Sequence, residues 1–211
     1  MVFDVLNMPV QMDYQVEAWG AYSEEIQDYV NLGITRNLST PDGTKLADMI
    51  DPYSYREALT QPKLILLGTN DPYWPVDAAR NYLDAVPGGN FLHYVPNAGH
   101  DLNGGEEALR VLSSFFSWTL RGSELPAFSS SIAVKESKAE IAVDARDGRG
   151  PVSARLWTAA SADRDFRDEE WISTQLVCRG NPEVQASVSL PLLGFRAFYI
   201  QMEFPGPEGN A

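Results

Sequence analysis

Residues 62–100, PKLILLGTNDPYWPVDAARNYLDAVPGGNFLHYVPNAGH, predict the fold of the first half of the chain. Two apolar runs, 63–67 and 90–95, are typical of β-strands, and the first is an unbroken Leu-Ile-Leu-Leu that suits a strand covered on both faces. Residues 76–86 have helical apolar spacing and end at Pro-Gly-Gly, so we expect a helix there. Strand, helix and strand in this order indicate a parallel α/β sheet.

A polar residue follows each of these two strands. Asp71 comes shortly after the first, and His100 lies in the loop after the second. A right-handed crossover would make the strands parallel and bring both loops to one sheet edge. An α/β hydrolase supplies the acid and the histidine of its triad in this way, in chain order nucleophile, acid, histidine. Each residue alone has a structural interpretation, such as turn capping for Asp71, but their joint placement favours catalysis.

The sequence gives little support for a metal site or a disulfide. His93 lies inside the second predicted strand, where we expect it to pack as a strand residue. A metal site built from Asp71, Asp77, His93 and His100 is disfavoured, because the acids lack EF-hand spacing and the histidines lack an H-E-x-x-H arrangement. Cys178 is the single cysteine, so no internal disulfide and no thiolate metal cluster can form. We expect no metal and no cofactor.

The charge of the chain disfavours nucleic acid as a partner. The formal net charge is −13, with only 16 Lys and Arg against 29 Asp and Glu. A protein that neutralises phosphates needs clustered basic residues. No apolar run approaches the roughly 20 residues that a membrane-spanning helix needs, so we expect no membrane span.

The first sixty residues are predicted from shorter patterns. Residues 2–6 favour a buried strand, whose exposed edge would be liable to self-association if its partner strand were missing. Helical spacing of aromatic and aliphatic residues predicts a helix over 19–30. Residues 36–48 contain a Pro-Asp-Gly turn signal and are expected to form a loop.

Residues 103–122 predict one more helix, and beyond residue 122 the spacing of apolar residues changes from helical to alternating. Asn103 and Glu106 resemble a capping box that opens a helix, and Arg121-Gly122 would close it. Five short alternating runs follow, which indicate an antiparallel sandwich of the immunoglobulin or fibronectin type; they are 139–143, 152–158, 171–176, 184–190 and 196–204. We therefore expect an α/β part over 1–122, a linker over 123–138 and an incomplete β-sandwich over 139–211.

Several segments resemble one known family. DVLNMPVQMDYQVEAWGAYSEEIQDY, DPYSY, PKLILLGTNDPYWPVDAARNY, VPNAGH and DFRDEEW are similar to the C-terminal half of the PhoPQ-activated pathogenicity-related protein family, of the α/β-hydrolase superfamily. The resemblance covers about residues 2–206. It implies part of a doubly wound hydrolase sheet followed by a small β-sandwich, in proteins that often carry an export signal. It also implies Asp71 as the triad acid, His100 as the triad base, and Tyr73 and Trp74 as residues that line the site.

One part of the family pattern is missing. A nucleophile elbow needs a Ser between small residues on a strand-to-helix turn before the acid. The serines before Asp71 are Ser23, Ser39 and Ser54, and none has glycines on both sides. We therefore expect a fragment, or a shortened gene product, that lacks the front of the hydrolase domain and is inactive alone.

Two functions remain open at this point. The first is a serine-type hydrolase acting on a small-molecule or peptide ester or amide, with the nucleophile outside these residues. The second is a non-catalytic binding or surface-interaction protein on a hydrolase scaffold, since a fold does not determine a function. An elbow serine in the full-length gene would favour the first.

Overall fold

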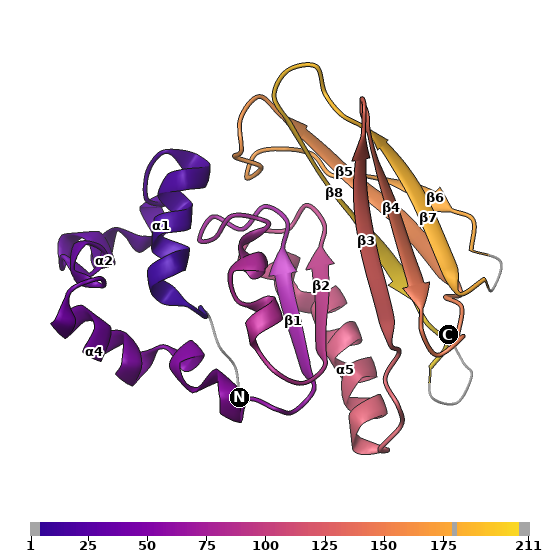
Figure 1. Cartoon of the computed structure of the whole chain (residues 1–211), viewed down its shortest axis with the longest axis horizontal. Coiled ribbons are helices and arrows are strands. Elements are labelled where there is room, and N and C mark those ends of the chain that lie inside the picture. Colours follow the sequence, from indigo (N-terminus) through magenta and orange to yellow (C-terminus); the bar gives the residue numbers. More distant parts are fainter. Residues whose placement is uncertain (1–4, 179–180, 207–211) are drawn as a thin grey trace. The chain divides into compact units, whose positions relative to one another are not determined.

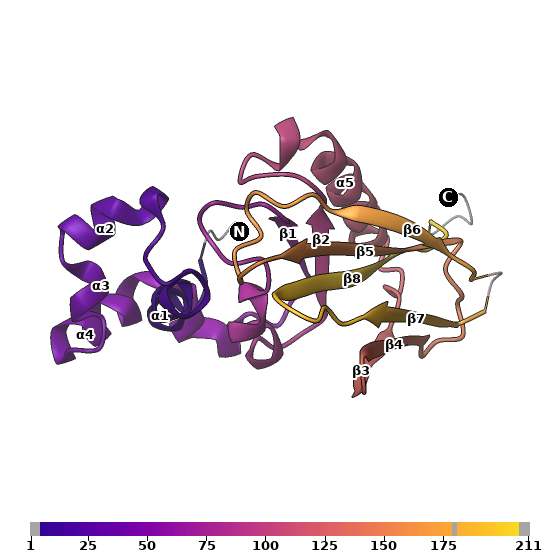
Figure 2. The ribbon, with the colours of Figure 1, turned by 90° about the horizontal axis from the view of Figure 1, so that it is seen from above.

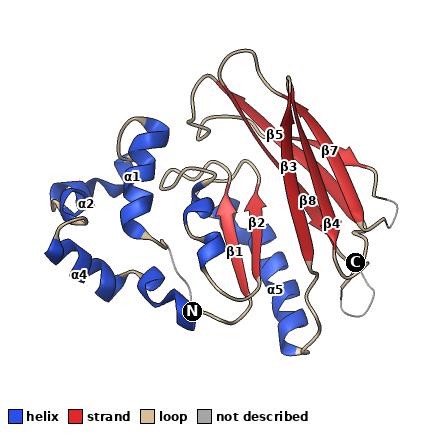
Figure 3. Cartoon of the chain, viewed as in Figure 1, coloured by secondary structure: helices blue, strands red, loops and turns tan. Residues whose placement is uncertain are grey.

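The computed structural model describes residues 5–178 and 181–206, and they form two compact units. One unit holds the chain up to Gly105 together with Arg164–Asp168, and the other holds Glu106–Asp163 and the residues after Asp168. Figure 1 shows helices dominating the first part of the chain and long strands the last part. These helices and small sheets confirm the expected mixed α/β class (Figure 3).

The first unit begins with short helices. They are α1 (Met8–Trp19), η1 (Glu24–Ile26), α2 (Gln27–Asn31), α3 (Ile34–Asn37), α4 (Pro41–Ile50) and η2 (Pro52–Ala58). The helix predicted over 19–30 is confirmed only for its second half, where η1 and α2 lie. It does not reach back to Trp19, where α1 ends because Gly20 adopts a left-handed φ of 77° and its N–H bonds the Val16 carbonyl. Of the strand predicted over 2–6, residues 2–4 lie outside the described residues, and Val5 and Leu6 are not in a strand. The predicted sheet edge there is therefore untested.

Helix α4 replaces the loop predicted over 36–48. Thr40 caps it by accepting a hydrogen bond from the Gly43 N–H (3.2 Å), and Pro41 occupies the first turn. Gly43 permits close contact with α3, since a Cβ there would lie 1.7 Å from the Asn37 carbonyl oxygen. The Pro-Asp-Gly sequence thus starts a helix instead of making a turn.

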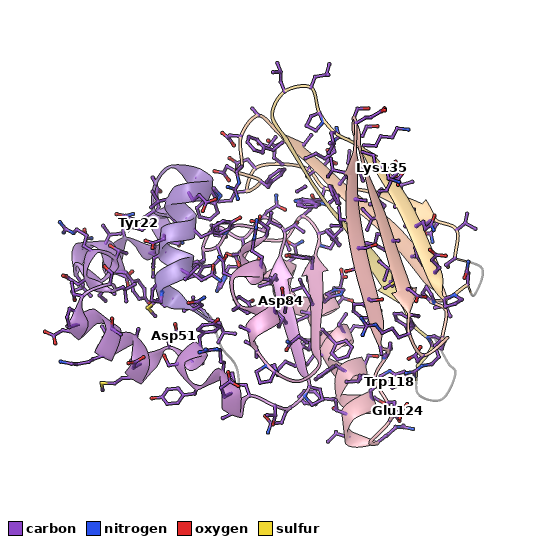
Figure 4. The ribbon with its side chains drawn as sticks, viewed as in Figure 1. Tyr22, Asp51, Asp84, Trp118, Glu124 and Lys135 are labelled. Carbon is purple, nitrogen blue, oxygen red and sulfur yellow. The ribbon has the colours of Figure 1, made fainter. Side chains whose placement is uncertain are left out.

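A buried carboxylate fixes the start of α1. Asp51, labelled in Figure 4, is 2% exposed and accepts hydrogen bonds from the N–H groups of Asn7 (3.2 Å) and Met8 (2.6 Å). The same side chain accepts from the N–H of Tyr53 in η2 (2.9 Å). An acid at a helix N-terminus satisfies otherwise unpaired donors. This carboxylate therefore joins two segments more than forty residues apart.

Strands β1 (Lys63–Gly68) and β2 (Asn90–Val95) pair in parallel, from Lys63 opposite Asn90 to Gly68 opposite Val95. Both predicted strands are confirmed. The single helix predicted over 76–86 is replaced by two short 3-10 helices in the same range, η3 (Ala78–Asn81) and η4 (Leu83–Ala85). The apolar side chains of this segment still form a core with β1: Ala79, Tyr82 and Val86 pack with Ile65 and Leu67.

Between β2 and the second half lie η5 (Leu102–Gly105) and α5 (Glu106–Leu120). The predicted capping box is wrong: Asn103 has a left-handed φ of 54° and its side chain donates to the Asn97 carbonyl. The predicted end of α5 is confirmed. There the N–H of Ser123 bonds the Trp118 carbonyl and the N–H of Gly122 bonds that of Thr119, the pattern of a Schellman motif.

Six strands form two three-stranded antiparallel sheets in the second unit. One has the order β3-β4-β7 and the other β6-β5-β8, and Figure 2 shows them as two layers. Their bounds are β3 (Phe128–Lys135), β4 (Lys138–Ala145), β5 (Ser153–Ser161), β6 (Ile172–Leu176), β7 (Glu183–Ser189) and β8 (Phe195–Glu203). All five runs predicted as strands are confirmed, and β3 is an additional strand within the segment predicted as a linker. Ile141, Leu156 and Val188, from both sheets, share one core cluster.

Candidate functional site

The candidate site lies where β1 and β2 end. Because the strands are parallel, with Gly68 opposite Val95, the loops that follow them leave the same edge of the sheet. We call residues 69–74 the acid loop and residues 96–101 the histidine loop. The predicted acid, Asp71, and the predicted base, His100, lie in these two loops.

Glycine at the end of β1 lets the two loops touch. A Cβ at Gly68 would lie 2.3 Å from the carbonyl oxygens of both Ala98 and Gly99, closer than any real Cβ contact. Two hydrogen bonds then connect the loops: the Asn70 N–H donates to the Ala98 carbonyl (2.9 Å), and the Asn97 N–H donates to Thr69 Oγ1 (2.8 Å). The histidine loop is thereby held against the acid loop.

Asp71 and His100 form a hydrogen-bonded pair. The distance from His100 Nδ1 to Asp71 Oδ2 is 2.9 Å, and Asp71 Oδ1 accepts the N–H of Tyr73 at 2.7 Å. An ionised carboxylate only accepts, so this contact requires the proton on Nδ1. The Asp71 side chain is 10% exposed, whereas the His100 side chain is 45% exposed. The buried acid thus orients an imidazole whose Nε2 lies on the ring edge opposite the carboxylate.

The two aromatic residues after the acid occupy different surroundings. The Tyr73 ring lies against the imidazole of His100, with a centroid distance of 4.3 Å. Trp74 packs against the helical core cluster that contains Met12 and Ile26. Its indole Nε1 is buried without a hydrogen-bond partner in the described part of the chain. Of the two residues predicted to line the site, Tyr73 therefore touches the pair and Trp74 contributes mainly to the core.

Buried polar side chains on the helical segment support the acid loop. Gln15, 0% exposed, donates through Nε2 to the Tyr73 carbonyl and accepts the N–H of Ser23 through Oε1. The hydroxyl of Ser23 donates to the Pro72 carbonyl at 2.6 Å. Sequence reasoning missed Gln15, Ser23 and the strand-end Gly68. Only Gly68 carried a signal, as a glycine between a strand and a polar loop.

Metal ligands do not gather in the described residues. No group of three or more His, Cys, Asp or Glu side chains within 5–178 and 181–206 is placed to hold an ion. Of the four residues considered above as metal ligands, Asp77 instead accepts a hydrogen bond from the hydroxyl of Tyr14 (2.7 Å), and His93 lies in β2 opposite Leu66.

Among the residues that the structure describes, no helix is long and apolar enough to cross a membrane.

Comparison with known proteins identifies a family and a curated relative. The family model described as PhoPQ-activated pathogenicity-related protein matches residues 1–167. Autocrine proliferation repressor protein A of Dictyostelium discoideum is 26% identical over 226 aligned residues, covering 97% of this chain and 46% of the relative. The chain therefore spans about half the length of that relative.

A solved structure is also similar over the smaller part of the chain. It is described as the crystal structure of the Br derivative of BhCBM56, and the match covers 40% of this chain and 84% of that one. The sequence identity is 13% and the TM-score is 0.30. A similarity at this level carries no argument about fold or function.

Proposed function

The chain belongs to the PhoPQ-activated pathogenicity-related protein family, and from that premise we propose that it supplies the acid and the base of a serine-type α/β hydrolase. The proposed substrates are esters or amides, either small molecules or peptides. The observation that carries the proposal is the contact of 2.9 Å between His100 Nδ1 and Asp71 Oδ2 at the edge of a parallel sheet.

This geometry suits general-base catalysis. His100 Nε2 takes the proton of a serine hydroxyl as its oxygen attacks the substrate carbonyl, and the resulting imidazolium then protonates the leaving group. Asp71 keeps the proton on Nδ1 and stabilises the imidazolium, because its carboxylate is held by the N–H of Tyr73 and is largely shielded from water. The half-exposed imidazole gives a substrate access to the base.

The nucleophile belongs to a part of the protein outside these 211 residues in this proposal. Two of the three serines that precede Asp71 have structural partners: Ser23 donates to the Pro72 carbonyl, and Ser54 lies 3.4 Å from the Ala47 carbonyl oxygen. The third, Ser39, is exposed and directly precedes the residue that caps α4. The 46% coverage of the Dictyostelium relative leaves ample length for an elbow elsewhere in such proteins.

The finer architecture follows from the same proposal. The β1–β2 pair would be the C-terminal strands of a doubly wound hydrolase sheet, whose other strands belong to the same missing part. The two antiparallel sheets of the second unit would be a small immunoglobulin- or fibronectin-like sandwich. Their common core cluster of Ile141, Leu156 and Val188 supports a sandwich.

Hydrolysis of an activated ester by the full-length gene product tests the proposal. The change His100→Ala should lower kcat by about 10³-fold or more, because removal of a triad member costs at least that much. His93→Ala is the matched control, since His93 is the other histidine and lies within β2. The isolated 211-residue chain should be inactive. Robust turnover by it would disprove the proposal that the nucleophile lies outside these residues.

The second candidate is a non-catalytic binding or surface-interaction protein on the same scaffold. The name of the Dictyostelium relative favours it, since that name describes a repressor of proliferation and no reaction. The two candidates differ in one outcome. A binding protein would keep its biological effect in the His100→Ala variant, whereas a hydrolase would lose it.

A further inference from the structure

A short segment from the second half of the chain belongs to the first unit. Residues Arg164–Asp168, which we call the strap, group with residues up to Gly105, although the chain on both sides of the strap belongs to the other unit. Phe166 at its centre is 7% exposed. A segment so placed must be held by specific contacts, and two anchors provide them.

The inner anchor is Asn70, the residue directly before the acid. Its Nδ2 donates to the carbonyl oxygens of Arg167 (2.9 Å) and Phe166 (3.3 Å). Its Oδ1 accepts the hydroxyl of Thr69 at 2.7 Å, and its own N–H donates to the Ala98 carbonyl at 2.9 Å. One side chain and its backbone therefore connect the strap, the acid loop and the histidine loop.

The outer anchor is Arg164. Its guanidinium pairs with the Glu17 carboxylate (3.0 Å), contacts the hydroxyl of Tyr14 and lies 3.8 Å from Asp77 Oδ2. The Tyr14 hydroxyl donates to Asp77 at 2.7 Å, and burial together with this carboxylate raises the pKa of Tyr14 to about 12. The neutral phenol therefore donates to Asp77 while its oxygen faces the Arg164 guanidinium.

An internal ion pair keeps the strap in shape. Arg167 Nε lies 2.9 Å from Asp165 Oδ1, and a second guanidinium nitrogen pairs with the other carboxylate oxygen. The same guanidinium lies over the Trp19 ring, 4.1 Å from its centroid. These contacts fix the two carbonyl oxygens that Asn70 needs.

We propose that the strap positions the acid loop through Asn70, which makes Asn70 a positioning residue for the Asp71–His100 pair. The inference rests on the proposed function for its catalytic meaning, but its structural content stands alone. A catalytic pair needs supporting contacts that hold it within a fraction of an ångström, and small misplacements lower turnover strongly. Asn70 is the neighbour of Asp71 on one side, and Tyr73, whose N–H holds the carboxylate, lies on the other.

Nitrogen NMR of the imidazole rings tests this without reference to activity. The chain has two histidines, so the ring nitrogens of His100 and His93 can be assigned by one substitution. In the wild-type protein His100 should show the Nδ1–H tautomer. In Asn70→Ala the His100 nitrogen shifts should move toward those of free imidazole, while the His93 shifts stay unchanged.

Asn90→Ala is the matched control. Asn90 also donates through Nδ2 to two backbone carbonyls, those of Val86 (2.8 Å) and Leu83 (3.1 Å), but it lies at the opposite end of β2. This variant should leave the His100 tautomer unchanged even if its melting temperature falls as much as that of Asn70→Ala. Unchanged His100 shifts in a folded Asn70→Ala protein would overturn the proposal.

Ester hydrolysis by the full-length gene product separates this inference from the proposed function. If both hold, Asn70→Ala lowers kcat by about tenfold with little change in KM. If the wild-type protein does not hydrolyse esters but Asn70→Ala still alters the His100 tautomer, the strap proposal stands and the hydrolase proposal fails. If hydrolysis is present and Asn70→Ala changes neither the tautomer nor kcat, the strap proposal fails.

Discussion

A side chain on Gly68 would collide with the backbone at Gly99, because a Cβ on Gly68 would lie 2.3 Å from the Gly99 carbonyl oxygen. The close approach of β1 to the loop that carries His100 therefore depends on a glycine at the strand end. A Cβ on Gly99 would make only ordinary van der Waals contacts, since the nearest atom would be 3.9 Å away. The two glycines give a direct test of how the site is assembled.

Gly68→Ala should separate the histidine loop from the acid loop. We expect a loss of about 1–3 kcal/mol in unfolding free energy from the forced overlap, and loss of the Nδ1–H tautomer of His100. Urea unfolding and imidazole NMR measure the two effects. Gly99→Ala should be close to wild type in both, and equal effects of the two changes would contradict this account.

Substitution of Tyr73 should mainly lower activity, whereas substitution of Trp74 should mainly lower stability. Tyr73→Ala removes the ring that lies 4.3 Å from the imidazole but keeps the backbone N–H that binds Asp71, so kcat should fall several-fold with a small change in stability. Trp74→Ala opens the core beside Met12 and should cost about 2–4 kcal/mol. Thermal unfolding and ester hydrolysis of both variants check this, and a larger stability loss for Tyr73→Ala would be the opposite result.

The ion pair between Asp165 and Arg167 in the strap should stabilise the protein less at low pH. The side chain of Arg167 holds the pKa of Asp165 below its ordinary value, with burial acting in the opposite direction. A carboxyl with a lowered folded-state pKa stabilises the protein fully above its unfolded value of about 3.9 and loses that effect as the pH falls through the folded value.

Asp165→Asn should therefore lower the melting temperature at pH 6 by an amount that corresponds to at most about 1 kcal/mol, the usual value of a partly exposed pair. The difference from wild type should begin to shrink as the pH falls below about 3.9 and should vanish only below the lowered folded-state pKa of Asp165. Melting curves over this pH range measure it, with the exposed Asp13→Asn as the control. A gap that widens toward low pH would refute the ion pair as the cause.

Two isoleucines that lie opposite each other in the pairing of β3 with β4 should contribute very differently to stability. Ile141 is 6% exposed in the core between the two sheets, and its register partner Ile132 is 61% exposed on the outer strand. Ile141→Ala should cost about 2–4 kcal/mol, while Ile132→Ala should cost less than about 1 kcal/mol. Urea unfolding of the two variants compares them directly, and similar losses would mean that β3 is covered in solution.

The strands were predictable because their patterns are local. β1 begins directly after Pro62 and ends at Gly68. In β4, buried and exposed positions alternate, as expected for a strand with one face in the core and the other toward solvent. β3 lacked that signal, since it carries Ser129, Ser130 and Ser131 and is exposed over most of its length. A strand held mainly by backbone pairing leaves little trace in apolar periodicity.

Errors in the helical part have a similar origin. The Pro-Asp-Gly sequence after Thr40 fits both a turn and a helix start, and the contact of Gly43 with the Asn37 backbone decides between them. Asp71 and His100 could be paired from sequence because each follows a strand of one sheet. The partners of Asn70 could not, since it binds backbone carbonyls 96 and 97 residues away, and carbonyl groups carry no sequence signal.

Activation of a serine by His100 can be measured by covalent labelling of the full-length gene product with a fluorophosphonate. Such probes react with serines whose proton is taken by a neighbouring base. We expect one labelled serine, identified by mass spectrometry, with labelling abolished in His100→Ala and preserved in His93→Ala. Equal labelling of wild type and His100→Ala, or no labelled serine in the wild-type protein, would contradict it.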